Sequence, residues 1–168
     1  MRSTLALLLV TLAGCHAPGT LGTAVGTAQA PPTTGAADVD AWLAKGFYTT
    51  WHCEPAAHAA RSPSPHGSNR ICSNDLLSSA GAGEFPVDAA AVKELIDGAD
   101  VVGHTVYRHV RAGTTGDTWF WYEKSHGSVF AVGLGDMGSP HDSCVGCHQY
   151  AGRDSSHSGH DFVYTQVQ

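Results

Sequence analysis

Three residues near the end of the chain have the types and spacing for covalent attachment of a cofactor. Cys144 and Cys147 are separated by two residues, and His148 follows at once. Two thiols at this spacing can each add to one of the two vinyl groups of a porphyrin, and the next histidine is then held beneath the iron as its proximal ligand. The motif predicts one covalent haem c, with His148 as the metal ligand.

Two other uses of Cys144 and Cys147 stay open at this point. A redox-active pair usually lies at the N-terminus of a helix in a thioredoxin-like βαβ setting, and no βα units are expected around this motif. A structural zinc site needs further ligands, and the sequence has no second Cys-x-x-Cys. His157 and His160 could bind a metal, although a polar loop is the plainer interpretation of that stretch.

Two residues just before the motif could supply a second axial ligand on the distal side of the haem. Met137 and His141 are of types that ligate haem iron. Both fall in a stretch rich in Gly, Pro and Asp, where a solvated side chain is the commoner outcome. If either binds, the iron is saturated and suits electron transfer; if neither binds, a position stays open for a small ligand.

Other residues are candidates for the surroundings of the haem. Glu123 and His126 could act in proton transfer, although polar residues at the end of a hairpin are usually only exposed. Trp51, Ile71 and Trp121 could form the wall of the pocket, and packing in the core explains them equally well.

The start of the chain predicts export. Arg2 supplies a positive end, and residues 5–12 form an apolar run too short to span a bilayer. The run ends in Leu12-Ala13-Gly14-Cys15, which resembles the lipobox of bacterial lipoproteins; an ordinary cleaved signal is the alternative. We expect a signal peptide over 1–15 and a lipid on Cys15 that holds the protein on the periplasmic or cell-surface side of a bacterial membrane without a spanning helix.

The remaining cysteines form a pair. Of five cysteines, one is assigned to the lipid and two to the haem, which leaves Cys53 and Cys72. In an exported chain these two are expected to form a disulfide, and closing a loop of that size stabilises by roughly 3 kcal/mol. A second redox-active pair is the alternative, but its spacing does not fit a reactive motif.

Charge narrows the class of partner. The 168 residues carry 9 basic and 15 acidic side chains, for a net charge of −6, and Lys45, Lys93 and Lys124 are the only lysines. Such a chain is poorly suited to holding phosphates, so nucleic acid is not expected as a partner. An acidic face could dock a basic redox partner protein.

The elements that position these residues follow from composition and periodicity. Residues 16–35 lack any charged side chain and predict a flexible tether, which leaves 36–168 as a single domain. Helices are expected over 39–47, with Asp38 as the cap, and over 87–96. Strands are expected over 48–53, 69–73, 101–111, 118–123, 128–132 and 162–164, with 124–127 as the loop of a hairpin. The predicted fold is α+β, mainly antiparallel sheet with a few helices, with the haem motif near its C-terminus.

Several segments in the same order resemble the cytochrome P-460 and cytochrome c′-beta family of monohaem c-type cytochromes. They are Trp42–Tyr48 with Trp51, Pro65–Gly67 with Arg70, Ala91–Leu95, Trp119–Trp121, Cys144–His148 and Asp161–Thr165. The resemblance covers residue 38 to the end, and only the haem motif is specific on its own; Cys53 and Cys72 depart from the family pattern. It implies a β-rich domain, often a homodimer, with His148 proximal and a distal side accessible to small molecules.

The resemblance implies one of two chemistries. One branch has a lysine cross-linked to the porphyrin and oxidises hydroxylamine or nitric oxide, whereas another lacks the link and binds diatomic gases. The lysine should follow the second strand, but 74–79 contains none, Lys45 and Lys93 are expected on helices and Lys124 in a turn. The cross-link is therefore expected to be absent.

The expected function is binding or conversion of a small ligand (NO, CO or another nitrogen oxide) at the haem iron. A periplasmic electron carrier with His141 or Met137 as sixth ligand is the alternative, and a sensor or structural haem is a third. Both an oxidoreductase and a carrier fit these features.

Overall fold

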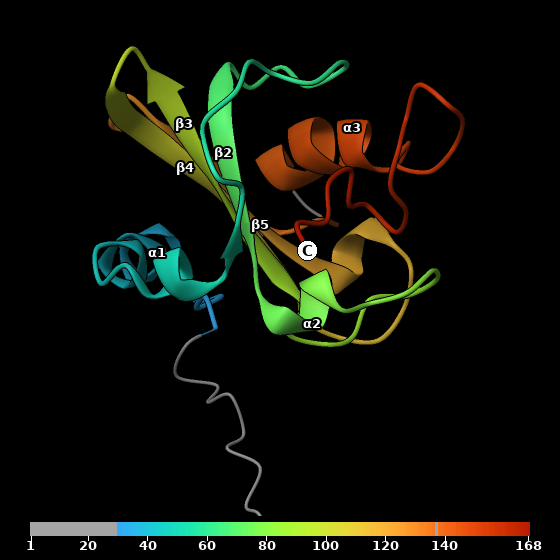
Figure 1. Ribbon diagram of the computed structural model, residues 1–168. Helices are drawn as coiled ribbons and strands as arrows, with labels where there is room; N and C mark the ends of the chain where they lie inside the picture. The colour runs from blue at the N-terminus through green and yellow to red at the C-terminus, as the bar shows by residue number, and fades with distance from the viewer. Residues whose placement is uncertain (1–29, 137) are drawn as a thin grey trace, which may run out of the picture.

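The computed structural model describes residues 30–136 and 138–168, and one antiparallel sheet runs through its centre (Figure 1). Six strands follow one another across the sheet in chain order, and each pairs antiparallel with the next. They are β1 (His52–Cys53), β2 (Ser68–Ser73), β3 (Ala90–Asp97), β4 (Asp100–His109), β5 (Trp119–Ser125) and β6 (Ser128–Leu134). The helices are α1 (Ala36–Leu43), η2 (Phe47–Thr50), α2 (Asp75–Ser78), η3 (Gly116–Thr118), η4 (Pro140–Val145) and α3 (Gly146–His148). The expected α+β fold with a mainly antiparallel sheet is confirmed.

The helix expected over 87–96 is wrong, because this segment contains strand β3. Val92, Leu95 and Ile96 fall at helical spacing, but every second side chain points to the same face of a strand. β3 is central in the sheet and buried on both faces, so its apolar residues form a nearly continuous run that periodicity cannot distinguish from a buried helix. Lys93 therefore lies on a strand.

The final strand expected over 162–164 is also wrong. His160 and Val163 exchange two backbone hydrogen bonds of 3.0 and 2.8 Å and close a tight turn around the two residues between them. The segment pairs with itself and is not a strand of the sheet, because Asp161 and Phe162 adopt positive φ and not an extended conformation.

Other boundaries shift for local reasons. The first helix ends at Leu43, and Gly46 then takes a left-handed conformation (φ 68°) that favours glycine. Only the last two residues of 48–53 form a strand, since η2 occupies Phe47–Thr50. The hairpin loop has two residues, His126 and Gly127, with φ of 48° and 79°, as a tight turn between twisted strands requires. Asp38 lies in the first turn of α1, and Gly35 is the capping residue.

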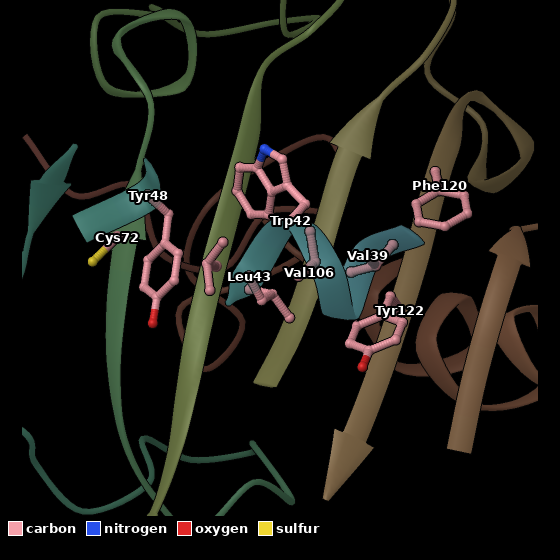
Figure 2. Packing of buried hydrophobic residues seen from close by; sticks show 9 residues of the cluster. Val39, Trp42, Leu43, Tyr48, Cys72, Val106, Phe120 and Tyr122 are labelled. Atoms are coloured by element: carbon pink, nitrogen blue, oxygen red, sulfur yellow. The ribbon is translucent and has the colours of Figure 1, made fainter. Parts of the chain in front are cut away.

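Helix α1 covers one face of the sheet. Val39, Trp42 and Leu43 from α1 pack on Val106 and Tyr122 from the central strands (Figure 2). All five are buried, and fully burying a side chain of this size stabilises by about 1.5–3 kcal/mol.

The disulfide between Cys53 and Cys72 is confirmed. It joins β1 and β2 at directly paired positions, on the edge of the layer that α1 covers. The folded part begins before residue 36, because Pro31 is fully buried and its carbonyl accepts a 2.6 Å hydrogen bond from Arg108.

Expectations for the first part of the chain are not tested here. The signal peptide, Cys15 and residues 16–29 of the tether lie outside the described residues. Within 30–136 and 138–168, no helix is long and apolar enough to cross a membrane.

The C-terminal segment covers the opposite face of the sheet. In Figure 1, α3 and the tail that follows it lie across the sheet from α1. Tyr107, Trp119 and Trp121 form the buried layer beneath this segment, which contributes Cys144 and Val163 to the packing. The sheet therefore separates two buried layers, and the predicted haem motif belongs to the second.

Candidate haem site

A cavity of about 1180 Å³ lies between the second face of the sheet and the segments around it. Its walls come from the central strands, from residues 61–69 before and at the start of β2, and from the end of the η4–α3 helix. In Figure 1 the loop between β1 and β2 extends at the top of the view toward α3. The volume exceeds the roughly 300–1,000 Å³ of most small-molecule pockets, so a cofactor as large as haem is a suitable occupant.

All three residues of the predicted motif line this cavity. Cys144 lies near the end of η4, while Cys147 and His148 lie on α3, and both thiols are free and half-buried. η4 is a π-helical segment, a rare conformation that is frequent at functional sites. The structure thus brings together the two thiols and the imidazole that the spacing predicted.

Two glycines let the motif approach the sheet. A Cβ atom on Gly116 would lie 2.5 Å from the Val145 side chain, and one on Gly135 would lie 2.1 Å from the Gly116 carbonyl oxygen. Real Cβ atoms do not come this close to other heavy atoms. Val145, between the two cysteines in sequence, therefore fixes the helix against η3 and the end of β6.

His148 is held in one tautomer. Its Nδ1 lies 2.6 Å from the carbonyl oxygen of Phe162. A carbonyl oxygen only accepts hydrogen bonds, so Nδ1 carries the proton and the lone pair of the neutral ring is on Nε2. The edge-on ring of Trp121, at 4.8 Å between centroids, and that of Tyr164, at 5.4 Å, fix the imidazole plane.

Burial keeps the imidazole of His148 neutral. It lowers the pKa of His148 to about 4, against the raising effect of the bond to Phe162, and the positive charges of Lys93 and His66 add to the lowering. A neutral histidine with Nδ1–H bonded to a backbone carbonyl is the usual form of a metal-ligating imidazole.

The structure argues against a redox-active cysteine pair. Burial raises the pKa of the Cys144 thiol to about 11, so this group is protonated at neutral pH. Reactive cysteines have lowered pKa values, because the thiolate is the nucleophile.

A row of paired residues crosses the cavity face of the sheet, one residue from each of five strands. The row is Ile71, Lys93, Thr105, Glu123 and Ala131, each directly opposite the next. Its charged members face the same cavity as the haem motif. Lys93 lies on β3 and not on the expected helix, and the alternation that could have placed it is hidden because β3 is buried on both faces.

The charges in this row influence one another. Burial lowers the pKa of Lys93 to about 8, although Glu123 opposes the shift. The pKa of Glu123 is lowered by His66, whose Nδ1 lies 3.6 Å from Glu123 Oε1, against the effect of burial. Lys93, Glu123 and His66 form a polar cluster in the cavity, and of these the sequence predicted only Glu123 as a candidate for proton transfer near the haem.

The structure describes one of the two predicted distal ligands, His141, and does not bring it into the cavity. Met137 lies outside the described residues. His141 has a side chain 60% exposed, pairs with Asp142 at 3.0 Å, and does not line the cavity. It lies on η4, the helical segment that continues into α3, which carries His148.

The other candidates divide between the two faces. Ile71 and Trp121 line the cavity wall, as expected, and the exposed His126 lies at its rim. Trp51 is not part of the wall, because it packs against Trp42 at 5.7 Å between ring centroids on the α1 side.

The histidines near the C-terminus have separate surroundings. His157 Nδ1 lies 2.8 Å from Asp154 Oδ1 in a polar turn, and the His160 ring stacks on Phe85 at 4.4 Å. Over the described part of the chain, no group of three or more His, Cys, Asp or Glu side chains is arranged to hold a metal ion. The polar-loop interpretation fits His157.

Comparisons of the chain with protein-family models, with curated proteins and with solved structures found no match.

Proposed function

We propose that the chain is an exported monohaem c-type cytochrome, lipid-anchored through Cys15, that binds or converts a small ligand such as NO, CO or another nitrogen oxide at the iron. The observation that carries this proposal is the state of His148. Its Nδ1 proton is engaged by Phe162, which leaves the Nε2 lone pair for a metal at the wall of a cavity that also contains two free thiols.

The residues present fit a covalent haem. Cys144 and Cys147 would hold the porphyrin through thioether bonds, and His148 would ligate the iron. When bound, the haem supplies an iron that binds small ligands and exchanges electrons. Tyr107 and Trp121 provide the large apolar surface on which a porphyrin excludes water.

The polar cluster supports ligand chemistry over simple electron transfer. Lys93, Glu123 and His66 can donate to or accept from a bound nitrogen oxide and can hold a proton beside it. His141 is exposed and lies outside the cavity, so it does not support the electron-carrier alternative.

The test is a visible spectrum of the protein co-expressed with a haem-attachment system, oxidised and then reduced with and without CO. A high-spin c-type spectrum that CO shifts supports the proposal, and a low-spin spectrum indifferent to CO would reject the open iron. The C144A/C147A variant should lose covalent haem after denaturation. The C53A/C72A variant is the matched control and should keep it.

A second candidate function is supported by Lys93. The lysine-linked branch of the resembled family oxidises hydroxylamine or nitric oxide, and the expectation that no lysine reaches the haem depended on placing Lys93 on a helix. Lys93 lies on β3 and lines the cavity. Mass spectrometry of the proteolysed holoprotein tests this candidate: a haem peptide that also contains Lys93 supports it, and a haem peptide with only the residues around Cys144 and Cys147 rejects it.

A further inference from the structure

The turn from His160 to Val163 has an unusual backbone. Its two central residues, Asp161 and Phe162, have φ of 42° and 67°, and neither is glycine. The left-handed conformation is tolerated by aspartate better than by most residues, whereas a bulky residue such as phenylalanine adopts it only when its surroundings hold it there. Something in the structure must therefore fix this turn.

Contacts with Phe85 fix it. One carboxylate oxygen of Asp161 accepts a 3.0 Å hydrogen bond from the backbone N–H of Phe85. The Phe85 ring is buried and stacks on the His160 ring at 4.4 Å with 17° between the planes. The other end of the turn is anchored by Val163, which is also buried. The turn is thus attached to a loop 76 residues earlier in the sequence, counted from Asp161 to Phe85.

This turn fixes the position of the Phe162 carbonyl group. The Phe162 carbonyl oxygen lies 2.6 Å from His148 Nδ1. In haem and zinc proteins, the acceptor of this proton fixes the ring orientation and raises the basicity of the ligating nitrogen. A shorter or better aligned bond makes the imidazole a stronger donor to iron, which favours the oxidised metal.

We infer that Asp161 is a positioning residue for the proximal histidine: by attaching the turn to Phe85, it holds the Phe162 carbonyl on His148 Nδ1 and so sets the electron donation of His148. The inference rests on the proposed function, because it assumes that His148 ligates the iron. Asp161 does not contact the cavity itself and acts through Phe162.

Two substitutions separate the anchor from the backbone conformation. In D161G the backbone keeps its freedom to adopt positive φ but the bond to Phe85 is lost. In D161N the side-chain oxygen can still accept from Phe85, and asparagine tolerates the same conformation. The matched control is D88G, because Asp88 also has a positive φ (74°) and a paired carboxylate, 2.7 Å from Arg108.

The readouts are the reduction potential of the holoprotein and the iron–histidine stretching frequency of the reduced form by resonance Raman spectroscopy. D161G should raise the potential and lower the stretching frequency, D161N should restore both toward the wild type, and D88G should change neither. Wild-type values in D161G, or equal shifts in D161G and D88G, would overturn the inference. Absence of covalent haem in the wild type would instead reject the proposed function.

A measurement on the wild type covers the case in which D161G does not fold. In the reduced CO complex, which is diamagnetic, the His148 Nδ1 proton should be visible by ¹⁵N-edited NMR and exchange slowly with water. A proton lost to fast exchange would overturn the inference, because the Phe162 carbonyl would then not be held in place.

Discussion

The two faces of the sheet carry neighbouring rows of charge that differ in how the charges are paired. Under α1, Arg70, Glu94, His104 and Lys124 are directly opposite one another across four strands. Arg70 lies 3.0 Å from Glu94, the Tyr48 hydroxyl donates to Glu94 at 2.9 Å, and Lys124 lies 2.8 Å from Asp40.

The row that faces the cavity is offset from the α1 row by one residue on each strand. Its charged side chains have few hydrogen-bond or ion-pair partners. The ammonium group of Lys93 has no hydrogen bond or ion pair to any residue that the structure describes, and Glu123 has His66 at 3.6 Å. Taking a charge out of water is unfavourable unless it is paired. The charges of the α1 row have partners in the row itself or on α1 and η2, which is typical of a structural role. In the cavity row, Lys93 lacks such a partner among the described residues, and perturbed charges of this kind are typical of functional sites.

The largest expected effect comes from breaking the paired row. Glu94 is 8% exposed, so E94A should leave Arg70 and the Tyr48 hydroxyl without their acceptor and lower the free energy of unfolding by about 2–3 kcal/mol. The equivalent change in the cavity row, E123A, should lower it by less than about 1 kcal/mol. Urea denaturation measures both, and equal losses would remove the distinction between the two rows.

Removal of the Lys93 charge from the cavity row should stabilise the fold, whereas removal of Glu94 from the α1 row should destabilise it. Because burial lowers its folded-state pKa to about 8 from 10.5, its charged form destabilises the fold below pH 8, and the unfolded chain binds more protons between these values. In protein prepared without haem, wild-type stability from this group should therefore rise from pH 8 to 10.5. K93M should be about 1–2 kcal/mol more stable than wild type at neutral pH, a figure reduced for partial exposure, and should lose this advantage above pH 10.5.

The control for Lys93 lies on the other face. K124M removes the ion pair with Asp40 and should be destabilising by roughly 0.5–1 kcal/mol. A stabilising K124M, or a K93M variant less stable than wild type at neutral pH, would contradict the assignment of the rows.

A smaller effect is expected at Glu54, which pairs with Arg61 at the start of wall segment 61–69, here called the cavity roof. Burial alone would raise the pKa of Glu54, but hydrogen bonds from Arg61, the Ile71 backbone and His58 lower it below 4.5. This group therefore stabilises fully above about pH 4.5, and its contribution is lost as the pH falls through the folded-state pKa. Unfolding free energies below pH 5 should fall less steeply in E54Q than in wild type. Parallel acid limbs would show that the roof does not depend on this carboxylate.

Substitution of His141 is expected to have no effect on the iron. H141A should leave the spin state and the reduction potential of the holoprotein unchanged, since the His141 side chain is exposed and outside the cavity. A change from low to high spin in this variant would show that the electron-carrier alternative is correct.

Features with a local cause were predicted from the sequence. The spacing of Cys144, Cys147 and His148 placed all three at one cavity, and the pairing of Cys53 with Cys72 followed from counting the cysteines. Both follow from the chemistry of the cysteine side chain, by its spacing in the motif and by its number in the chain.

What the sequence missed depends on tertiary position. β3 was assigned as a helix because burial on both faces removes the alternation that identifies a strand, and Lys93 was misplaced with it. The Phe162 carbonyl could not be predicted, since any residue has one and its contact with His148 depends on positive φ at residues other than glycine. Asp161 was the one available hint, as aspartate tolerates that conformation.

The order of the strands has a consequence for how the protein is made. Each strand pairs with the one synthesised just before it, so the sheet can assemble through short-range closures as successive strands become available. The segment with Cys144, Cys147 and His148 comes last and docks on a face that is already formed. Until it docks, both thiols remain accessible to the enzymes that would attach the haem. Under the proposed function, haem attachment and docking of the last cavity wall would then be the same final step of folding.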